Sequence, residues 1–373
     1  MKTFVQALPL PNAPEYAGRC ARKHLAWTDH PSARLLMQRT TRIALLQLEP
    51  AFKQPERSIQ HANQLIASIA PDEIDLLILP EMAFTGYGFQ SFEDLEPFIE
   101  SETDGISMTW ARNVAQKLNC HVMIGFPQRI TEPGVRQIYN ALGIVSNRGE
   151  LIKVYHKTQL YPPVDPLWAR PGDGFLVMDL NIARINGEPN KPVKCCIGVC
   201  MDLSPDRFEA PFDAYELSSF AAKHNAEMMI CSMAWISTTP VPDPHYTESG
   251  KSWEETADVI NYWAMRCVPF WKLEDRSFVT CNRVGKEGGQ RIISLSPFIH
   301  PLRSNSLALH FLPFPDHPIF AYVDTIFTGT SCAISNAHQL LKNTSSDHKF
   351  TVIDYASKHR PELLIVKIPL PAT

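Results

Sequence analysis

The sequence has little of what would mark a membrane protein, a disulfide-rich protein or a metalloenzyme. No stretch of its 373 residues approaches 18 uninterrupted apolar positions, which argues against a transmembrane helix and predicts no membrane partner. The nine cysteines form no C-x-x-C pair, which favours reduced thiols in a cytoplasmic protein over a disulfide framework. The 13 histidines show no His-x-x-x-His spacing, so we expect no metal site.

The chain also lacks a strong charge of either sign and any internal repeat. The formal net charge is −4 and the pI is near 6.4, so we expect no nucleic acid partner. Hydrophobic residues make up 45% and charged residues 20%, which is the composition of an ordinary globular protein. We expect a single domain over residues 41–373, because no linker interrupts this part of the chain.

Residues 1–40 differ from the rest because they are basic. They hold two acidic residues, Glu15 and Asp29, against six basic ones: Lys2, Arg19, Arg22, Lys23, Arg34 and Arg39. A basic, acid-poor extension is typical of a mitochondrial targeting segment, which would add a mitochondrial form to the cytoplasmic one. Four prolines disfavour the amphipathic helix of such a segment, and a disordered extension is the alternative. Met37 could act as an internal start that omits the extension.

The pattern of apolar residues predicts an α/β protein with a mixed sheet and outer helices. We expect helices over residues 55–69, 107–118 and 214–224. We expect strands over 42–48, 76–81, 121–126, 139–145, 151–155, 192–199, 228–233, 277–284 and 363–368, with the fourth and fifth joined as a hairpin. The proline-rich segments around 240–244 and 297–318 are expected to be long loops.

Three reactive side chains stand where an apolar, strand-like run gives way to a turn. Glu81 follows LLILP, Lys157 follows VYH, and Cys200 follows CIGV. Enzymes of the α/β class present functional groups at the carboxyl ends of their strands. A carboxylate, an ammonium and a thiol are the base, the oxyanion donor and the nucleophile of covalent amide hydrolysis. The three residues therefore predict a hydrolase that acts on amides.

Each of these side chains also has a plainer interpretation. A cysteine among apolar residues is usually inert core, but Cys200 ends its run and Asp202 follows it. A glutamate after a strand can cap a helix, and a lysine at a strand end is usually solvated. As a base, Glu81 would have a pKa raised by desolvation, which suits proton transfer near neutral pH. Lys157 and the backbone N–H of Met201 would hold the developing oxyanion.

The motifs around the three residues resemble those of the nitrilase, or carbon–nitrogen hydrolase, superfamily. They are LPEM and TGY at Glu81, YHK at Lys157 and GVCMD at Cys200, with CNRVGKEG and FTGTS further on, and the resemblance covers about residues 41 to 370. It implies a four-layer αββα sandwich and hydrolysis through a Cys thioester without a cofactor. The stretches CMDLSP, FEAPF and YWAMR resemble the branch of fungal amidohydrolases that act on protein N-termini.

For that branch, the resemblance implies deamidation of N-terminal Asn and Gln of proteins or peptides to Asp and Glu. Ammonia is released, and the product feeds the N-degron pathway of protein degradation. The alternative is a small-molecule amidase or N-carbamoyl amidohydrolase of the same superfamily. A protein that has lost catalysis is disfavoured, because all three catalytic positions are filled. The family often pairs two sandwiches through helices, so a homodimer is an open expectation.

Substrate recognition is less defined by the sequence. Family members carry a second glutamate eight residues after the lysine, and Asp165 occupies that position here. This shorter acid could brace Lys157 or point at the substrate amine. A free α-ammonium calls for a carboxylate partner. The candidates, among which the sequence does not choose, are Asp165, Asp202, Glu209 and Glu287. Segment 237–255 is expected to line an open mouth, with Trp235 as an apolar wall or as part of the core.

Overall fold

A computed structural model describes residues 39–132, 135–236, 253–292, 321–336, 351–358 and 360–371. The strands are β1 (Arg39–Gln47), β2 (Leu76–Ile78), β3 (His121–Glu132), β4 (Val135–Val145), β5 (Leu151–His156), β6 (Leu176–Ile185), β7 (Glu188–Val199), β8 (Met228–Ser232), β9 (Ser277–Cys281), β10 (Val284–Ile292), β11 (Ala321–Thr328), β12 (Cys332–Ser335), β13 (Thr351–Tyr355) and β14 (Glu362–Pro369). The helices are α1 (Pro55–Leu65), α2 (Phe92–Leu95), α3 (Ile106–Leu118), α4 (Glu216–Lys223), α5 (Trp253–Arg266) and α6 (Val268–Trp271). Single 3₁₀ turns are η1 (Glu96–Phe98), η2 (Asp165–Leu167), η3 (Cys200–Leu203), η4 (Asp206–Phe208) and η5 (Phe212–Ala214).

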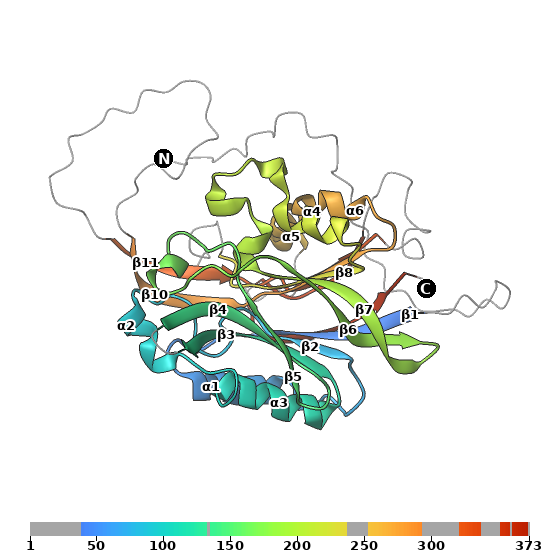
Figure 1. The fold of residues 1–373 in the computed structure, drawn as a ribbon, viewed down its shortest axis with the longest axis horizontal. Coiled ribbons are helices and arrows are strands. Elements are labelled where there is room, and N and C mark those ends of the chain that lie inside the picture. The colour runs from blue at the N-terminus through green and yellow to red at the C-terminus, as the bar shows by residue number, and fades with distance from the viewer. Residues whose placement is uncertain are drawn as a thin grey trace, which may run out of the picture.

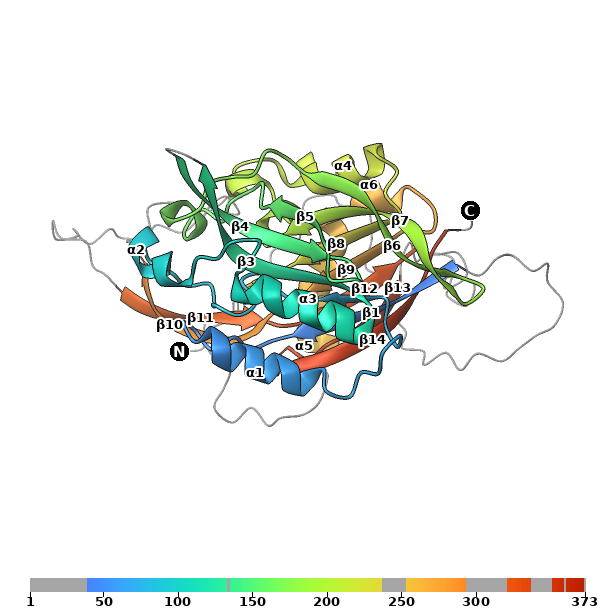
Figure 2. The same cartoon turned by 60° about the horizontal axis from the view of Figure 1, so that its bottom comes forward.

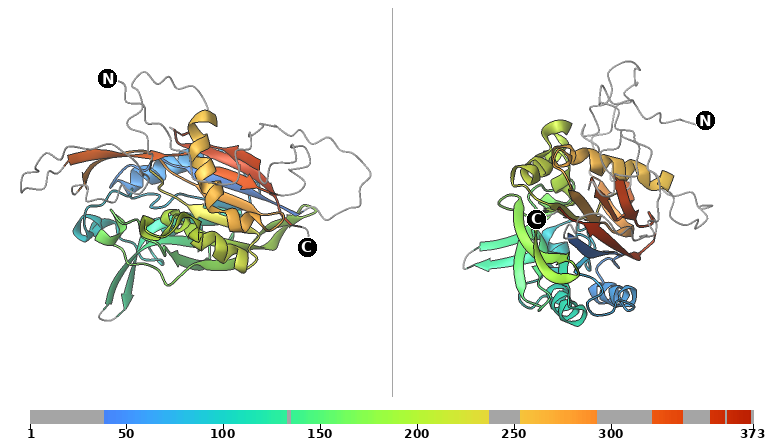
Figure 3. Two further views of the ribbon diagram at one scale, coloured as in Figure 1. Left: turned by 90° about the horizontal axis from the view of Figure 1, so that it is seen from above. Right: turned by 90° about the vertical axis from the view of Figure 1, so that its right-hand side faces the viewer.

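One hydrogen-bonded path connects most of the described strands. Its order is β13–β12–β9–β8–β7–β6–β1–β2–β3–β4–β5, with β14 beside β1, and β10 pairs separately with β11. β1 meets β6 through two register pairs, Arg39 with Ile185 and Thr40 with Arg184, whereas it pairs with β14 along almost its whole length. Because β1 and β6 touch only at their ends, the path separates there into two sheets that pack face to face (Figures 1 and 3).

The alternation of apolar side chains explains why each sheet is covered on both faces. Leu45 of β1 packs into the core between the two sheets, where Ile197 of β7 and Ile230 of β8 also lie. Its neighbour Leu46 points the other way and packs in the cluster that includes Ala111 of α3. Successive side chains of a strand alternate between the two faces. An apolar run such as IALLQL therefore requires a second sheet on one side and helices on the other.

The helices supply the two outer layers. Figure 1 shows α1 and α3 on one side of the sheets and α4, α5 and α6 on the other, and Figure 2 shows α1 and α3 side by side over one sheet. Trp263 of α5 and Phe270 of α6 are fully buried in the core cluster of the second sheet. The predicted four-layer αββα sandwich is confirmed. No helix among the described residues is long and apolar enough to span a membrane.

Several elements match the prediction and others differ from it. The predicted helices correspond to α1, α3 and α4, and the predicted hairpin corresponds to β4 and β5. β3 is longer than expected, and its hairpin with β4 projects from the sandwich (Figure 3, left). The strand expected to end at Glu81 stops at Ile78, because Pro80 has no N–H to continue the ladder. The strand expected over 277–284 is interrupted at Asn282 and Arg283, between β9 and β10.

Other helices and strands were not predicted, namely α2, α5, α6, β6 and β10 to β13. The first strand begins at Arg39, so the expected boundary at residue 40 lies just inside β1. The rest of the basic extension, including Met37, lies outside the described residues, and so do the proline-rich loops around 240–244 and 297–318. The targeting segment and the internal start therefore stay predictions.

Candidate active site

Glu81, Lys157 and Cys200 come from three strand ends and meet in one buried cluster. Glu81 lies in the turn after β2, Lys157 directly follows β5, and Cys200 directly follows β7. The side chains of Glu81 and Lys157 have no exposed surface, and Lys157 Nζ lies 2.7 Å from Glu81 Oε1. Both charges act on the thiol of Cys200. The structure thus brings together the three groups that the sequence placed at strand ends.

The turn at Cys200 is a tight elbow. Cys200 has φ of 42°, in the left-handed region that residues other than glycine seldom adopt. Asp202 holds this turn, because its Oδ2 accepts the backbone N–H of Val199 and the hydroxyl of Tyr155, each at 2.8 Å. Strained backbone of this kind is common at functional sites. Here it turns the thiol out of the line of β7.

Cys200 also differs from the other cysteines in its surroundings. Its exposed fraction is 9%, whereas the other seven described cysteines are at most 1% exposed. Burial raises the pKa of the Cys200 thiol well above its usual value, and the charge of Glu81 raises it further. The ammonium of Lys157 and the backbone N–H of Ala234 lower that pKa in part. The resting thiol is therefore neutral and would need a base, which is the role that the sequence predicts for Glu81.

Glu81 is held by donors on both carboxylate oxygens. Oε1 accepts Lys157 Nζ and Asn140 Nδ2, each at 2.7 Å. Oε2 accepts the backbone N–H of Ala234 at 2.8 Å. The backbone N–H of Ala234 also lowers the pKa of the Cys200 thiol. Burying a carboxylate is costly unless it is paired, and these donors supply the pairing.

Lys157 is buried between two acids. Its Nζ lies 2.7 Å from Asp165 Oδ2 and 2.7 Å from Glu81 Oε1. Burial alone would lower the pKa of Lys157, but the charges of Asp165 and Glu81 outweigh it and raise the pKa above its usual value. The ammonium is therefore charged at neutral pH. It can serve as a fixed positive group beside the thiol.

Asp165 braces this ammonium. Besides Lys157, its Oδ2 accepts the backbone N–H of Tyr161 at 2.8 Å. Its Oδ1 accepts the Tyr87 hydroxyl at 2.9 Å and Asn140 Nδ2 at 3.3 Å. A carboxylate has about four acceptor positions, and all are used here. Of the two roles left open by the sequence, the contacts favour the brace over the substrate amine.

Asp202 is likewise fully engaged, which disfavours its predicted role in substrate binding. Its Oδ1 accepts the backbone N–H groups of Thr158 and Gln159 at 3.0 and 2.7 Å, in addition to the two bonds at Oδ2. Burial raises the pKa of Asp202 to about 6, although these hydrogen bonds lower it. Asp202 has no lone pair left for a substrate. It ties the elbow of Cys200 to the loop that follows Lys157.

The predicted role of Glu287 in substrate binding is disfavoured for the same reason. Its Oε2 accepts the backbone N–H of Gly88 at 2.7 Å and that of Tyr87 at 3.1 Å. Its Oε1 lies 2.5 Å from Arg283 Nη1. The side chains of Glu287 and Arg283 are both buried, so this pair is shielded from solvent. Glu287 thus supports the loop that carries Tyr87 and does not face a substrate.

Glu209 is the remaining candidate acid. It is exposed, and no described residue hydrogen-bonds to its carboxylate. The ring of the preceding residue, Phe208, packs edge-on against Tyr161 with centroids 6.2 Å apart. Burial and the charge of Cys200 raise the pKa of Tyr161 to about 12, so this tyrosine borders the thiol. Glu209 therefore lies on a segment that contacts the rim of the site.

Trp235 and Met201 occupy positions next to the cluster. Trp235 follows Ala234, is half-buried, and packs against Tyr262 and Trp263 with centroids 5.4 and 5.8 Å apart. It is thus part of the core on one side and accessible on the other. Met201 is buried in the elbow, where its carbonyl accepts the backbone N–H of Ser204. Its role as an oxyanion donor stays a prediction. Of the segment 237–255 expected to line the mouth, residues 237–252 lie outside the described residues and the last three begin α5.

Three members of the cluster were missed in the sequence, namely Tyr87, Asn140 and the backbone N–H of Ala234. Asn140 carried the clearest signal, because it is a carboxamide inside the apolar strand IYNALGIV. A buried polar group in such a strand needs a partner, which marks a functional or structural contact. Among the described residues no set of three His, Cys, Asp or Glu side chains could hold a metal ion.

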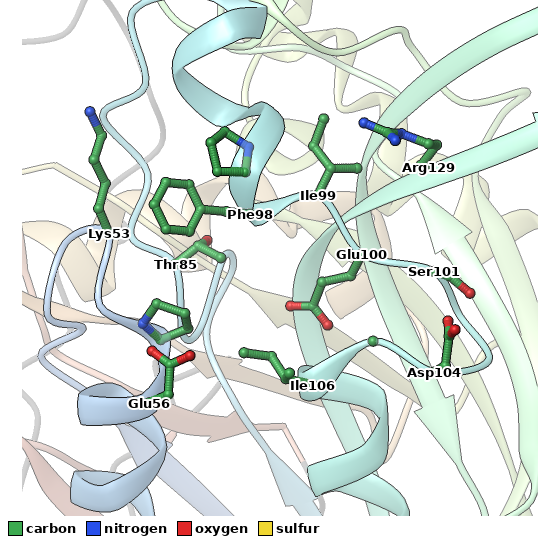
Figure 4. A pocket seen from close by; sticks show the side chains of 13 residues that line it. Lys53, Glu56, Thr85, Phe98, Ile99, Glu100, Ser101, Asp104, Ile106 and Arg129 are labelled. Atoms are coloured by element: carbon green, nitrogen blue, oxygen red, sulfur yellow. The ribbon is translucent and has the colours of Figure 1, made fainter.

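A cavity of about 540 Å³ lies apart from this cluster, between the starts of α1 and α3. None of the three strand-end residues lines it. Figure 4 shows Lys53, Glu56 and Phe98 on its wall, with the side chain of Glu100 pointing into it. Glu100 is 7% exposed and accepts the hydroxyl and the backbone N–H of Ser107 at 2.6 and 2.8 Å.

Comparisons with known proteins agree with the geometry. The family model of the carbon–nitrogen hydrolases matches residues 42–202, which include all three strand-end groups. The protein N-terminal amidase of Schizosaccharomyces pombe is 30% identical over 262 residues, which cover 65% of this chain and 85% of that protein. The chain belongs to the carbon–nitrogen hydrolase family. The resemblance stated from the motifs is thereby confirmed.

Two further likenesses are narrower. The protein N-terminal amidase of Saccharomyces cerevisiae is 31% identical over 225 residues, so the match covers 57% of this chain and about half, 48%, of that relative. A crystal structure of an N-terminal amidase with an Asn-Glu-Ala peptide has a TM-score of 0.65 at 18% identity, covering 89% of this chain and 99% of that one. One with a Gln-Val peptide has a TM-score of 0.65 at 19% identity, covering 88% and 98%. At these identities the solved structures establish the fold.

The buried carboxyl group of Glu100 should make the stability of the protein depend on pH. Burial raises its pKa from 4.5 to about 7, although the hydrogen bonds from Ser107 lower it. Because the folded pKa is above the unfolded one, this contribution is complete below about pH 4.5 and is lost as pH rises through 7. We expect Glu100→Gln to make the free energy of unfolding, measured in urea, fall less between pH 5 and 8. Glu56→Gln, on the exposed wall of the same cavity, is the control. Equal pH dependence in Glu100→Gln and the parent would contradict this.

Gly125 of β3 predicts a steric requirement for the Glu81 turn. A Cβ on Gly125 would lie 2.6 Å from Glu81 Cα and 2.7 Å from Met82 N, which are backbone atoms that must then shift. We expect Gly125→Ala to lower hydrolytic activity by about 10²-fold, because a base misplaced by about 1 Å is ineffective. Gly143→Ala on the neighbouring strand meets the flexible end of Met108 and should keep most activity. Equal loss in both variants would show that crowding of the sheet, and not the turn, is responsible.

Proposed function

We propose that this protein is an amidohydrolase that converts N-terminal asparagine and glutamine of proteins or peptides to aspartate and glutamate. The observation that carries the proposal is the buried cluster in which the Cys200 thiol meets the Glu81 carboxylate and the Lys157 ammonium. The choice of amide is supported by the names of the two yeast relatives and by the peptides bound in the similar structures.

In the first half of the reaction, Glu81 takes the proton of the Cys200 thiol as the sulfur attacks the side-chain amide carbon. The carbonyl oxygen becomes negative and is stabilised by Lys157 Nζ and the backbone N–H of Met201. Glu81 then gives its proton to the amide nitrogen as the carbon–nitrogen bond breaks. Ammonia leaves, and a thioester joins the substrate to Cys200.

In the second half, a water molecule takes the place of ammonia. Glu81 accepts one of its protons while the oxygen attacks the thioester carbon, and Lys157 again faces the oxyanion. The thioester bond breaks, the thiolate takes the proton back, and the acid product leaves. Each step uses Glu81 in alternating acid and base roles, which requires that its carboxylate stay fixed between the thiol and the substrate. The donors on both of its oxygens supply that constraint.

We propose that Glu209 binds the substrate amine. Asp165, Asp202 and Glu287 have their oxygens occupied by donors of the protein. The exposed carboxylate of Glu209 is free of such contacts within the described residues. A carboxylate at the rim can pair with the positive α-ammonium of a chain end while the side-chain amide reaches inward to Cys200.

The proposed product has a negative side chain at its N-terminus. The reaction would therefore prepare proteins for degradation through the N-degron pathway. A cytoplasmic site of action is supported by the eight described cysteines, which are all free thiols. A mitochondrial form would depend on the basic extension, and a homodimer paired through outer helices stays an expectation. No cofactor is needed in the proposed reaction.

Incubation with defined peptides tests the substrate. Peptides that begin with Asn or Gln should gain the mass difference between amide and acid and release one ammonia, detected by mass spectrometry and an ammonia assay. Their N-acetylated forms lose the positive charge and should react at least about 10-fold more slowly. Free glutamine and N-carbamoyl amino acids run in parallel, and Cys200→Ala is the inactive control. Equal rates on free and acetylated peptides would favour the small-molecule amidase.

Glu209→Gln tests the recognition of the amine. The variant keeps the shape of the side chain but removes its charge, so KM for Asn-peptides should rise about 10-fold while kcat changes little. The difference between free and acetylated peptides should shrink by a similar factor. Asp206→Asn, an exposed acid on the same segment, is the matched control and should keep the parent KM. An unchanged preference for the free amine in Glu209→Gln would exclude Glu209 from this role.

A further inference from the structure

Asn140 lies inside the reactive cluster although it carries no charge. It is fully buried in β4, opposite Pro127 of β3. Its backbone carbonyl accepts the N–H of Lys157 at 2.9 Å, so its main chain already helps to place the ammonium. Its side chain extends to the two acids that surround this ammonium.

The orientation of the Asn140 carboxamide follows from its neighbours. Nδ2 donates to Glu81 Oε1 at 2.7 Å and to Asp165 Oδ1 at 3.3 Å. The amide nitrogen has two hydrogens, so it can serve both carboxylates at once. The reverse orientation would set the amide oxygen against two negative groups. Oδ1 is buried and has no hydrogen-bond partner within the described part of the chain. The side chain therefore donates to both carboxylates, while its own acceptor is left without a hydrogen bond from any described residue.

The charge balance shows why a neutral donor stands here. Two carboxylates share one ammonium, that of Lys157, at 2.7 Å from each. The other titratable groups around Lys157 are the Cys200 thiol, the hydroxyls of Tyr87 and Tyr161, and the Asp202 carboxylate, whose oxygens are held by four donors; none of these groups is positive. A second cation would compete with Lys157, and a third acid would leave the negative charge in excess. A carboxamide stabilises both carboxylates without changing the net charge.

We propose that Asn140 is a positioning residue that fixes Oε1 of Glu81 and thereby aims Oε2 at the thiol of Cys200. The inference rests on the proposed function, because it assigns Glu81 the role of base. Oε1 is fixed by Asn140 and Lys157, and Oε2 accepts the backbone N–H of Ala234, the same group that lowers the pKa of the Cys200 thiol. Loss of the Asn140 donor would let the carboxylate turn about its single bond to the chain, away from the nucleophile.

The test uses Asn140→Asp and Asn140→Leu in the full-length protein. Asn140→Asp has nearly the same shape but places a third carboxylate beside Glu81 and Asp165. The added like charge disfavours the ionised form of the neighbouring carboxylates. The acid limb of kcat/KM against pH should therefore move to higher pH, and kcat near neutral pH should fall at least about 10-fold. Asn140→Leu removes the donor without adding charge, so kcat should fall by a similar factor while KM changes less than about 3-fold.

A second readout does not depend on the substrate. The rate of Cys200 alkylation by iodoacetamide, followed by mass spectrometry of the labelled peptide, reports how easily the thiol loses its proton. In Asn140→Asp the added negative charge should shift this pH profile upward as well. If the alkylation profile shifts but the parent protein leaves Asn- and Gln-peptides unchanged, the proposed substrate is wrong and the role of Asn140 stands.

Asn336 provides the matched control. It is also a buried asparagine, but its Nδ2 donates to the backbone carbonyls of Trp271 and Leu273. Asn336→Asp should lower stability without moving either pH profile. The inference is overturned if Asn140→Asp keeps the parent profiles and kcat, or if Asn336→Asp shifts them to the same extent. A shift confined to Asn140→Asp, with a circular dichroism spectrum like that of the parent, supports it.

Discussion

The arrangement on which the rest of the site depends is a buried ammonium between two carboxylates. Lys157 has no exposed surface and lies 2.7 Å from both Glu81 and Asp165. Buried charges are tolerated only when ion pairs and hydrogen bonds replace the lost water. Removing one partner leaves a buried charge uncompensated, which strongly destabilises the folded protein. The donors around the two acids are therefore not incidental. They include the carboxamide of Asn140 and the hydroxyl of Tyr87, which come from different parts of the chain.

This requirement links the chemistry to the packing of the two sheets. Glu81 and Lys157 belong to the sheet that contains β1, whereas Cys200 belongs to the other. Hydrogen bonds cross between the sheets at this point: Glu81 accepts the backbone N–H of Ala234, and Asp202 accepts the N–H of Thr158. Correct packing of the sandwich and correct geometry of the site thus depend on the same contacts. A site built in this way is preorganised, because its donors are fixed before the substrate arrives.

The interior and the rim of the site have different characters. Inside, every acid has its oxygens occupied by the protein, so the charges there can act on the reacting atoms but cannot serve as general binding groups. At the rim, Phe208 packs edge-on against Tyr161, and the exposed residue Glu209 follows Phe208 in the chain. In the proposed reaction, this division lets one region perform the bond changes while the other selects the chain end that enters.

The amino-acid pattern alone identified Glu81, Lys157 and Cys200, because each follows an apolar, strand-like run. That information is local, because an apolar run followed by a turn is visible in any stretch of about ten residues. The hydrogen-bond partners of these side chains lie far away in the sequence. Asn140 is 59 residues from Glu81 and Ala234 is 153 residues from it. That Asp202 and Glu287 accept backbone N–H groups is visible only in the folded chain, because the packing of distant strands sets the partner of a buried charge.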